Sequence, residues 1–169
     1  MKRPLGINEP TPRNSKHAAN KNASKSNAST SQNVTKNELA KFLPKNGLSA
    51  LVVDDAYIGR IYHKILLTNL GVECRDVSNG QDAVALCREG AFFHLILMDM
   101  EMPIMSGLEA TRMLREIGIR SMIIGVTAHN KEWQVREFID VGLDGYEEKP
   151  LSYEKLIDIL RDLDASQST

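Results

Sequence analysis

The sequence is poor in cysteine, in aromatic residues and in long apolar runs. Of its 169 residues, two are Cys, one is Trp and 5% are aromatic. Cys74 and Cys87 lack metal-ligand spacing and two thiols make no disulfide framework, so we expect both to be reduced. No apolar stretch approaches the roughly 20 residues of a membrane span. The N-terminal segment also lacks the apolar core of a secretory signal, so we expect an intracellular protein, cytoplasmic or also nuclear, with no membrane partner.

Charge is divided unevenly along the chain, although its formal net value is only −1. Residues 1–46 carry nine Lys and Arg against two Glu, whereas residues 47–169 carry twelve against twenty Asp and Glu. The first segment is rich in Asn, Ser and Thr and has few large apolar residues. It cannot bury enough surface to offset chain entropy, so we expect a disordered tail. Its charge allows weak, salt-sensitive contact with nucleic acid, but nothing supports sequence-specific binding.

From Leu48 onward, apolar runs alternate with amphipathic stretches. We expect strands in the segments LSALVV, VECRDV, HLILMD, SMIIGVTA and DGYEEK, with the partly polar second one at an edge. Helices are expected at about 56–70, 79–90, 108–117 and 131–141, and from Pro150 to about Leu163; Gly71, Gly90 and Gly142 are the expected stops. The alternation predicts one α/β domain at 47–165, a parallel sheet with helices on both faces, and a short flexible end at 166–169.

Polar residues follow four of these strands at the point where each strand ends. The first ends in Asp54 and Asp55, the third in Asp99, the fourth in Thr127 and the fifth in Lys149. The carboxyl ends of parallel strands form the edge where ligands bind in such sheets. Three carboxylates packed together repel, and a hard divalent cation such as Mg²⁺, which takes oxygen ligands, removes that conflict. Taken singly, Asp54 is as readily explained as a helix N-cap.

Four segments resemble motifs of the receiver domain of two-component response regulators. They are VVDD at 52–55, LILMDMEMPIMSG at 95–107, GVTA at 125–128 and DGYEEKP at 144–150. The gaps between them also match, and the SMIIGVT strand and the DMEMP loop are most similar to plant type-C response regulators. The resemblance implies a flavodoxin-like, doubly wound five-stranded sheet of order 2-1-3-4-5 with five helices. It also implies a stand-alone, monomeric receiver without an output domain.

The same resemblance implies that Asp99 accepts a phosphoryl group. The donor would be the phosphohistidine of a histidine-containing phosphotransfer protein or of a histidine kinase. Asp55, Asp99 and the backbone carbonyl of Glu101 would ligate Mg²⁺, and Asp54 would act through a metal-bound water or as an anchor. Such a protein catalyses only its own phosphorylation and slow dephosphorylation. The alternative is a Mg²⁺-dependent aspartyl-phosphate phosphatase, although the position of its second catalytic Asp is occupied by Glu101 and no cap insertion is present.

Two further residues at this edge, Thr127 and Lys149, would hold the phosphoryl oxygens, since they offer a hydroxyl donor and an ammonium. The Lys149-Pro150 junction resembles one that the family keeps cis. Tyr146 matches the family's aromatic switch, whose ring would turn inward when Thr127 moves towards the phosphate. A tyrosine that only fills space at a strand end is the alternative for Tyr146. For Trp133, in the fourth expected helix, packing is the favoured interpretation.

The first expected helix has more apolar surface than one packing face requires. Tyr62, Leu66 and Leu70 form one apolar face, which we expect the sheet to cover. Ile58, Ile61 and Ile65 form a second stripe beside it, and a surplus of this kind is typical of an interaction site. By resemblance, this stripe would contact the phosphotransfer protein. Burial of all three isoleucines by neighbouring helices is the alternative.

Overall fold

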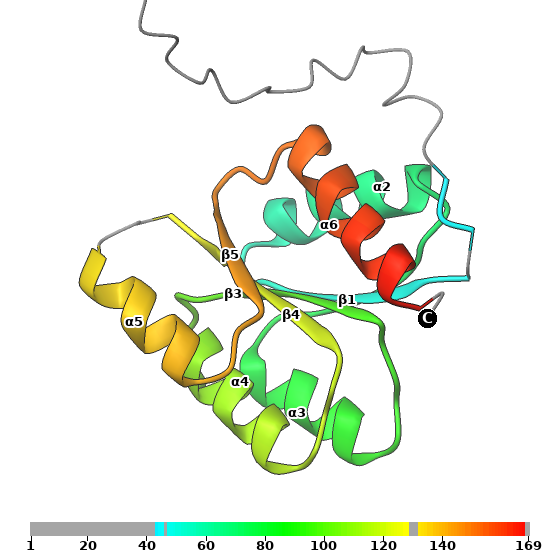
Figure 1. The fold of residues 1–169 in the computed structure, drawn as a ribbon. Coiled ribbons are helices and arrows are strands. Elements are labelled where there is room, and N and C mark those ends of the chain that lie inside the picture. Colours follow the sequence, from blue (N-terminus) through cyan, green and yellow to red (C-terminus); the bar gives the residue numbers. More distant parts are fainter. Residues whose placement is uncertain (1–42, 46, 129–131, 168–169) are drawn as a thin grey trace, which may run out of the picture. The chain divides into compact units, whose positions relative to one another are not determined.

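A five-stranded parallel sheet organises the chain. The structure, a computed structural model, describes residues 43–45, 47–128 and 132–167, without the side chains of 132–135, so nearly all of the expected tail lies outside the described residues. The elements are β1 Ser49–Val53, α2 Tyr57–Asn69, β2 Glu73–Val77, α3 Gly80–Arg88, β3 Leu95–Asp99, α4 Gly107–Glu116, β4 Met122–Thr127, α5 Glu132–Asp140, β5 Gly145–Glu148 and α6 Tyr153–Ser166 (Figure 1). The sheet order is β2-β1-β3-β4-β5 with every pair parallel, which confirms the predicted topology and the edge position of β2.

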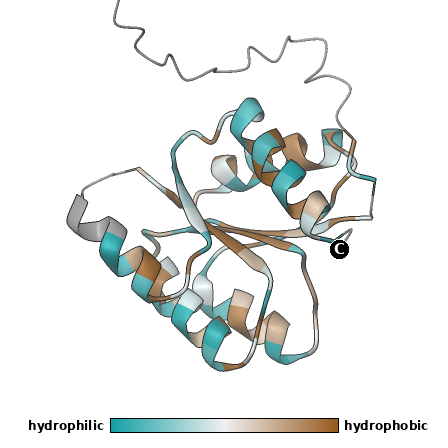
Figure 2. Cartoon of the chain, in the orientation of Figure 1, coloured by the Kyte–Doolittle hydropathy of each residue, from teal (hydrophilic) through white to brown (hydrophobic). Residues whose placement is uncertain are grey.

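Each face of the sheet has its own apolar core, because side chains alternate between the faces along a strand. Ala50 and Val52 of β1 point into the core under α2 and α6. Leu51 and Val53, between them in sequence, point into the core under α3, α4 and α5. The central strands are apolar on both faces, as the hydropathy colouring shows (Figure 2). Burial on both faces explains why β3 reads as an unbroken apolar run.

The helix ends follow from local sequence. Ser106 and Glu109 form a capping box at the start of α4, where the Glu109 N–H donates to Ser106 Oγ and Ser106 N–H donates to Glu109 Oε2. The expected stops have φ values that favour glycine, 76° at Gly71, 93° at Gly90 and 94° at Gly142. In the described part of the chain, no helix has both the length and the apolar content to cross a membrane.

Two expectations about the helices were wrong. The last helix begins at Tyr153 rather than Pro150, with Ser152 as its N-cap, and it ends at Ser166. It therefore includes the first residue of the segment that we expected to be a flexible end.

The second error concerns part of the face of α2 that packs on the sheet. Leu70 is buried and Leu66 packs against the core, as expected, but Tyr62 is 38% exposed and the buried residues of the helix are His63 and Leu67. The apolar pattern missed this part of the face, because it gives no place to a buried histidine.

Candidate functional site

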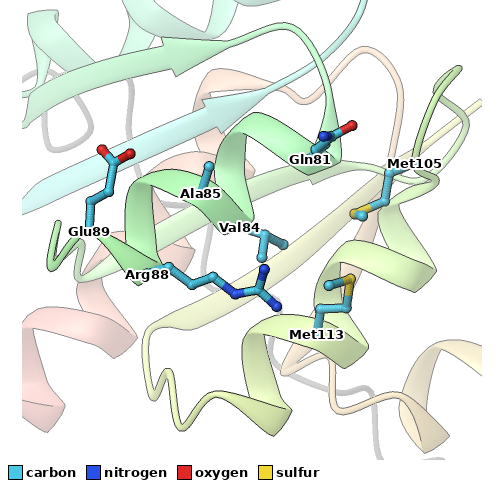
Figure 3. A pocket seen from close by; sticks show the side chains of 7 residues that line it. All are labelled: Gln81, Val84, Ala85, Arg88, Glu89, Met105 and Met113. Carbon is cyan, nitrogen blue, oxygen red and sulfur yellow. The ribbon is translucent and has the colours of Figure 1, made fainter.

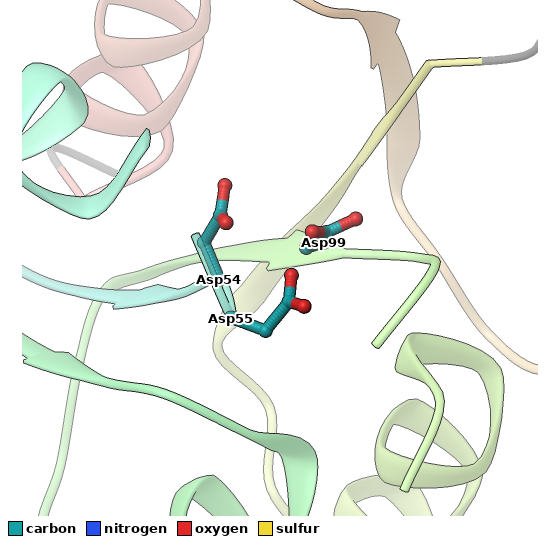
Figure 4. A group of neighbouring side chains, drawn as sticks. All are labelled: Asp54, Asp55 and Asp99. Atoms are coloured by element: carbon teal, nitrogen blue, oxygen red, sulfur yellow. The ribbon is translucent and has the colours of Figure 1, made fainter. Parts of the chain in front are cut away.

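The three predicted carboxylates converge where β1 and β3 end (Figure 4). These strands are neighbours in the sheet but not in sequence, and Val53 pairs with Met98, so Asp54 and Asp99 follow at adjacent positions. One carboxylate oxygen from each of Asp54, Asp55 and Asp99 lies within 4.8 Å of the other two. The strand order reverses between β1 and β3, and this is the crevice where ligands bind in open α/β sheets.

Burial differs among the three carboxylates. Asp54 and Asp99 retain 2% and 3% of their accessible surface, whereas Asp55 is exposed. The set thus offers hard oxygen donors at a solvent-facing opening, which is the ligand chemistry that Mg²⁺ takes. The residues present therefore fit a divalent cation, and no histidine or cysteine joins this acidic group within the described part of the chain.

Lys149, at the end of β5, reaches two of the carboxylates. Its Nζ donates to Asp99 Oδ2 at 2.7 Å and to Asp54 Oδ2 at 3.2 Å. The backbone N–H of Lys149 donates to the Thr127 carbonyl at 2.8 Å, which fixes the lysine against the end of β4. The peptide bond between Lys149 and Pro150 is cis, as the family resemblance implied. Four strand ends thus meet at one site, as predicted.

Burial and neighbouring charge both shift pKa values at this site. Burial raises the pKa of Asp99, and hydrogen bonds from Lys149 and from the Glu101 N–H offset only part of that effect. Burial alone would lower the pKa of Lys149, but its interactions with Asp99 and Asp54 outweigh burial and raise it. Burial thus dominates at Asp99, whereas attraction to two carboxylates dominates at Lys149.

The remaining predicted residues surround this centre. Glu101 is exposed, and its backbone N–H donates to Asp99 Oδ1 at 3.0 Å. Thr127 is 1% exposed at the end of β4. Tyr146 is half-buried in β5, with its ring edge-on to Phe138 at a centroid distance of 6.0 Å. Trp133 lies in α5, but its side chain is outside the described set.

Three residues of α2 that were not predicted also adjoin the acidic group. A Cβ on Gly59 would lie 2.6 Å from Asp54 Oδ2, so only glycine permits this approach of the helix. Arg60 donates to the carbonyls of Asp54 and Asp55. His63 is 4% exposed, its Nε2 has no hydrogen-bond partner, and burial lowers its pKa despite the nearby Asp54. A glycine inside a helix is disfavoured by about 1 kcal/mol, and that signal could have revealed Gly59.

Two cavities differ sharply in their relation to the acidic group. A cavity of about 410 Å³ adjoins it and is almost entirely apolar; its lining includes Asp54, Ile58, Tyr62, His63, Lys149 and Pro150. A second cavity, of about 370 Å³, lies between α3 and α4 (Figure 3). Met105 and Met113 contribute to the second lining, and none of the predicted site residues does. The first cavity is therefore the one with a direct connection to the site.

The fold and the site define a doubly wound α/β protein with an acidic, lysine-containing centre at its topological switch point. Residues 50–161 match the response regulator receiver domain family, and the chain belongs to that family. It is 44% identical over 133 residues to Two-component response regulator 24 of Arabidopsis thaliana, covering 77% of this chain and 96% of that protein. The predicted similarity to plant single-domain response regulators is thereby confirmed.

Solved structures of receiver domains support the same fold. The Saccharomyces cerevisiae complex of the phosphotransfer protein Ypd1 with the Ssk1 receiver domain matches with a TM-score of 0.69 at 26% identity, covering 76% of this chain and 95% of that chain. The receiver domain of the Arabidopsis thaliana histidine kinase CKI1, complexed with Mg²⁺ and BeF3⁻, matches with a TM-score of 0.59 at 30% identity, covering 70% and 90%.

Proposed function

We propose that this receiver accepts a phosphoryl group on Asp99 from a phosphohistidine protein, in the presence of Mg²⁺. The observation that carries this proposal is the Asp99 carboxylate itself. It is 97% buried at a strand end, contacts the Lys149 ammonium at 2.7 Å, and lies in a group of three carboxylates. A carboxylate buried in this way does not stabilise the fold through packing, since burial of an acidic group raises its free energy.

The chemistry follows from the positions of these groups. A carboxylate oxygen of Asp99 forms a bond to phosphorus while the bond from phosphorus to the imidazole nitrogen breaks, and the imidazole leaves with that electron pair. Lys149 and Thr127 hold the phosphoryl oxygens, since both side chains end at the same edge. Asp55, Asp99 and the carbonyl of Glu101 would hold Mg²⁺, with Asp54 as a water-mediated or indirect ligand. A bound Mg²⁺ supplies positive charge that offsets the carboxylates and the phosphoryl oxygens.

Phosphorylation would be transmitted through Thr127 and Tyr146. Thr127 lies at the end of β4, and Tyr146 lies one strand away in β5 with its ring against Phe138. Movement of the Thr127 hydroxyl towards the phosphoryl group would vacate space that the half-buried Tyr146 ring can fill. Phe138 of α5 would then lose or change its edge-on contact, so the signal would reach the surface at α5.

Labelling by a phosphohistidine protein tests the nucleophile. We expect about one phosphate per chain, carried as an acyl phosphate that hydroxylamine releases, and no incorporation in Asp99→Asn. Asp140→Asn, an exposed substitution in α5, is the matched control and should label normally. Undiminished labelling of Asp99→Asn would refute the assignment. Continued turnover of p-nitrophenyl phosphate, abolished by the same variant, would instead identify a phosphatase.

The partner surface is proposed to lie on the exposed side of α2. Ile58 is 77% exposed and Ile65 is 52% exposed, whereas Ile61 is half-buried. The alternative that neighbouring helices cover all three isoleucines is therefore wrong for two of them. Ile58 also lines the apolar cavity beside Asp54 and Lys149, so the stripe is continuous with the site. A helical phosphotransfer protein resting on it would bring its phosphohistidine to Asp99.

Comparison of two phosphoryl donors distinguishes docking of the partner protein from the phosphorylation reaction itself. Ile58→Asp should slow transfer from the phosphotransfer protein at least tenfold and leave labelling by acetyl phosphate unchanged, because a small donor needs no protein contact. Ile139→Asp is the matched control, since Ile139 is 62% exposed on α5. Equal losses with both donors, or equal losses in both variants, would show that α2 is not the docking surface.

A further inference from the structure

Arg60 makes an unusual set of contacts beside the acidic group. It lies in the first turns of α2, and its Nη1 donates to the Asp54 carbonyl at 2.9 Å and to the Asp55 carbonyl at 3.1 Å. Its guanidinium also lies over the Tyr57 ring, 5.7 Å from the centroid. With 15% of its side chain exposed, Arg60 is packed into the structure and is not a freely solvated charge.

A carboxylate on the edge strand holds the other side of the guanidinium. Arg60 Nε lies 3.4 Å from Asp76 Oδ2 in β2, and Lys64 Nζ donates to Asp76 Oδ1 at 2.6 Å. The hydrogen bond from Lys64 and the charges of Lys64 and Arg60 lower the pKa of Asp76. Asp76 therefore stays ionised near neutral pH and anchors Arg60 between β2 and the loop after β1.

Apart from Lys149, which holds the Asp54 carboxylate, the loop after β1 has few other restraints. Ala56, the N-cap of α2, has no side chain able to cap the helix. The Ala56 N–H donates to Asp54 Oδ1 at 2.8 Å, and the Asp54 N–H donates to the Val77 carbonyl at 3.3 Å. The direction of the exposed Asp55 side chain depends on its own backbone, and Arg60 contacts that backbone directly. The guanidinium is rigid and planar, so its hydrogen bonds hold a carbonyl group in one position.

We infer that Arg60 is a positioning residue for the divalent cation, because it fixes the backbone of Asp54 and Asp55 so that their carboxylates converge with that of Asp99. The inference rests on the proposed function, since it assumes that this group binds Mg²⁺. The positive charge of Arg60 alone would predict the opposite effect on Mg²⁺ affinity. A cation beside a metal site repels the metal, so removal of Arg60 would strengthen Mg²⁺ binding if its charge were all that mattered.

Loss of positioning and loss of charge repulsion predict opposite changes in Mg²⁺ affinity, so calorimetric titration with Mg²⁺ tests the inference directly. Arg60→Ala should weaken binding about tenfold, the usual scale for loss of an outer-shell partner. Arg60→Lys keeps the charge but replaces the fork by a single ammonium, so it should also weaken binding. Lys64→Met is the matched control, because it removes the other cation on Asp76 without touching the loop, and its affinity should not fall. Asp76→Asn frees one side of Arg60 and should have a smaller effect in the same direction as Arg60→Ala.

Labelling by acetyl phosphate distinguishes positioning from a merely structural role. In Arg60→Ala, a tenfold higher Mg²⁺ concentration should restore the labelling rate, and the far-ultraviolet circular dichroism should match that of the wild type. Unchanged or tighter Mg²⁺ binding in Arg60→Ala overturns the inference, and so does a labelling defect that excess Mg²⁺ does not correct. Absence of Mg²⁺ binding in the wild-type chain would overturn both the inference and the proposed function.

Discussion

Two charged clusters lie at opposite ends of the parallel strands, one at their amino ends (the amino edge) and one at their carboxyl ends (the carboxyl edge). The clusters differ in how completely positive and negative charges are paired. At the amino edge, before β4 and β5, Arg115 donates to the carbonyls of Gly142, Ile119 and Ser121 at 2.9, 2.8 and 2.9 Å. Its Nη2 also donates to Asp144 Oδ2 at 2.7 Å, and that oxygen accepts the Ile123 N–H as well. One cation thus meets one carboxylate and three fixed carbonyls.

At the carboxyl edge, negative side chains are in excess over positive ones. Lys149 is shared between Asp99 and Asp54, and Asp55 lies within reach of the same point. Its carboxylates therefore outnumber its cation, and the raised pKa of Lys149 reflects this excess, whereas burial is the main reason for the raised pKa of Asp99. A cluster with matched charge serves stability, whereas one with unmatched charge is prepared for a cation or a phosphoryl group. The carboxylates also differ in burial, since Asp54 and Asp99 are buried and Asp144 is exposed, so burial combined with unmatched negative charge distinguishes the functional cluster from the structural one.

The largest expected effect is on chemistry at the carboxyl edge. Lys149→Arg should lower the rate of phosphorylation by acetyl phosphate about 100-fold, the usual scale for loss of one preorganised donor. A guanidinium is larger and planar, so it cannot replace a compact ammonium between Asp99 and Asp54 without crowding the phosphoryl position. The free energy of unfolding should change little, because the charge is kept.

Lys155→Arg is the control for this substitution, because Lys155 is exposed and pairs with Glu147 away from the acidic group. It should be phosphorylated at the wild-type rate. If Lys149→Arg were also labelled at close to the wild-type rate, Lys149 would have no special role in holding the phosphoryl group. The two edges would then not differ in the manner argued above.

The next effect belongs to the amino edge. Arg115→Met should lower the free energy of unfolding by about 2 kcal/mol, because three partly buried carbonyls lose their charged donor, whereas the pair with the exposed Asp144 contributes little. Urea unfolding measures this change, and Arg112→Met on the exposed side of α4 should change stability by less than about 0.5 kcal/mol. Mg²⁺ affinity and phosphorylation per folded molecule should stay at wild-type values. A loss of Mg²⁺ affinity in Arg115→Met would contradict the separation of the two edges.

Much of the carboxyl edge could be predicted from the sequence, because its residues lie at strand ends. An apolar run identifies a buried strand, and the polar residue that follows it must emerge at the edge where the parallel strands end. Position after a predicted strand was therefore sufficient to identify Asp54, Asp55, Asp99, Thr127 and Lys149, without any knowledge of distances. The order of the strands came from the family resemblance, and the structure confirmed it.

The parts that could not be predicted depend on packing between elements. His63 has no apolar character, yet it lies on the buried side of α2 beside Leu67, so the apolar periodicity of the helix could not place it there. Arg60 and Arg115 look alike in sequence as single basic residues on helices. Only the folded chain shows that one holds the loop of the site and the other ties the starts of β4 and β5 together. Long side chains reach several carbonyls at once, and no linear pattern records such contacts.

The smallest expected effect is a pH dependence of stability at the carboxyl edge, measured without Mg²⁺. The folded-state pKa of Asp99 is raised by burial, so the unfolded chain releases this proton first as the pH rises. Ionisation of Asp99 therefore favours unfolding, and any stability that the protonated form contributes is lost as the pH passes the folded-state pKa. The Asp99→Asn variant has no ionisable group at this position, so its stability does not fall in this way as the pH rises. The free energy of unfolding of Asp99→Asn minus that of the wild type should thus increase from pH 4 to pH 7.

Lys149 does not disturb this measurement. Its raised pKa lies above the interval, so Lys149 stays charged between pH 4 and pH 7 and its own titration adds no slope. The effect of its charge on Asp99 is already contained in the folded-state pKa of Asp99. Asp140→Asn, in an exposed part of α5, should show no comparable slope. Addition of Mg²⁺ should stabilise the wild type and shrink the difference at pH 7, because a ligand that binds only the folded state adds to its stability. A difference that stayed flat or fell with rising pH would mean that Asp99 is stabilised as an anion by Lys149, and the carboxyl edge would then be as well matched as the amino edge.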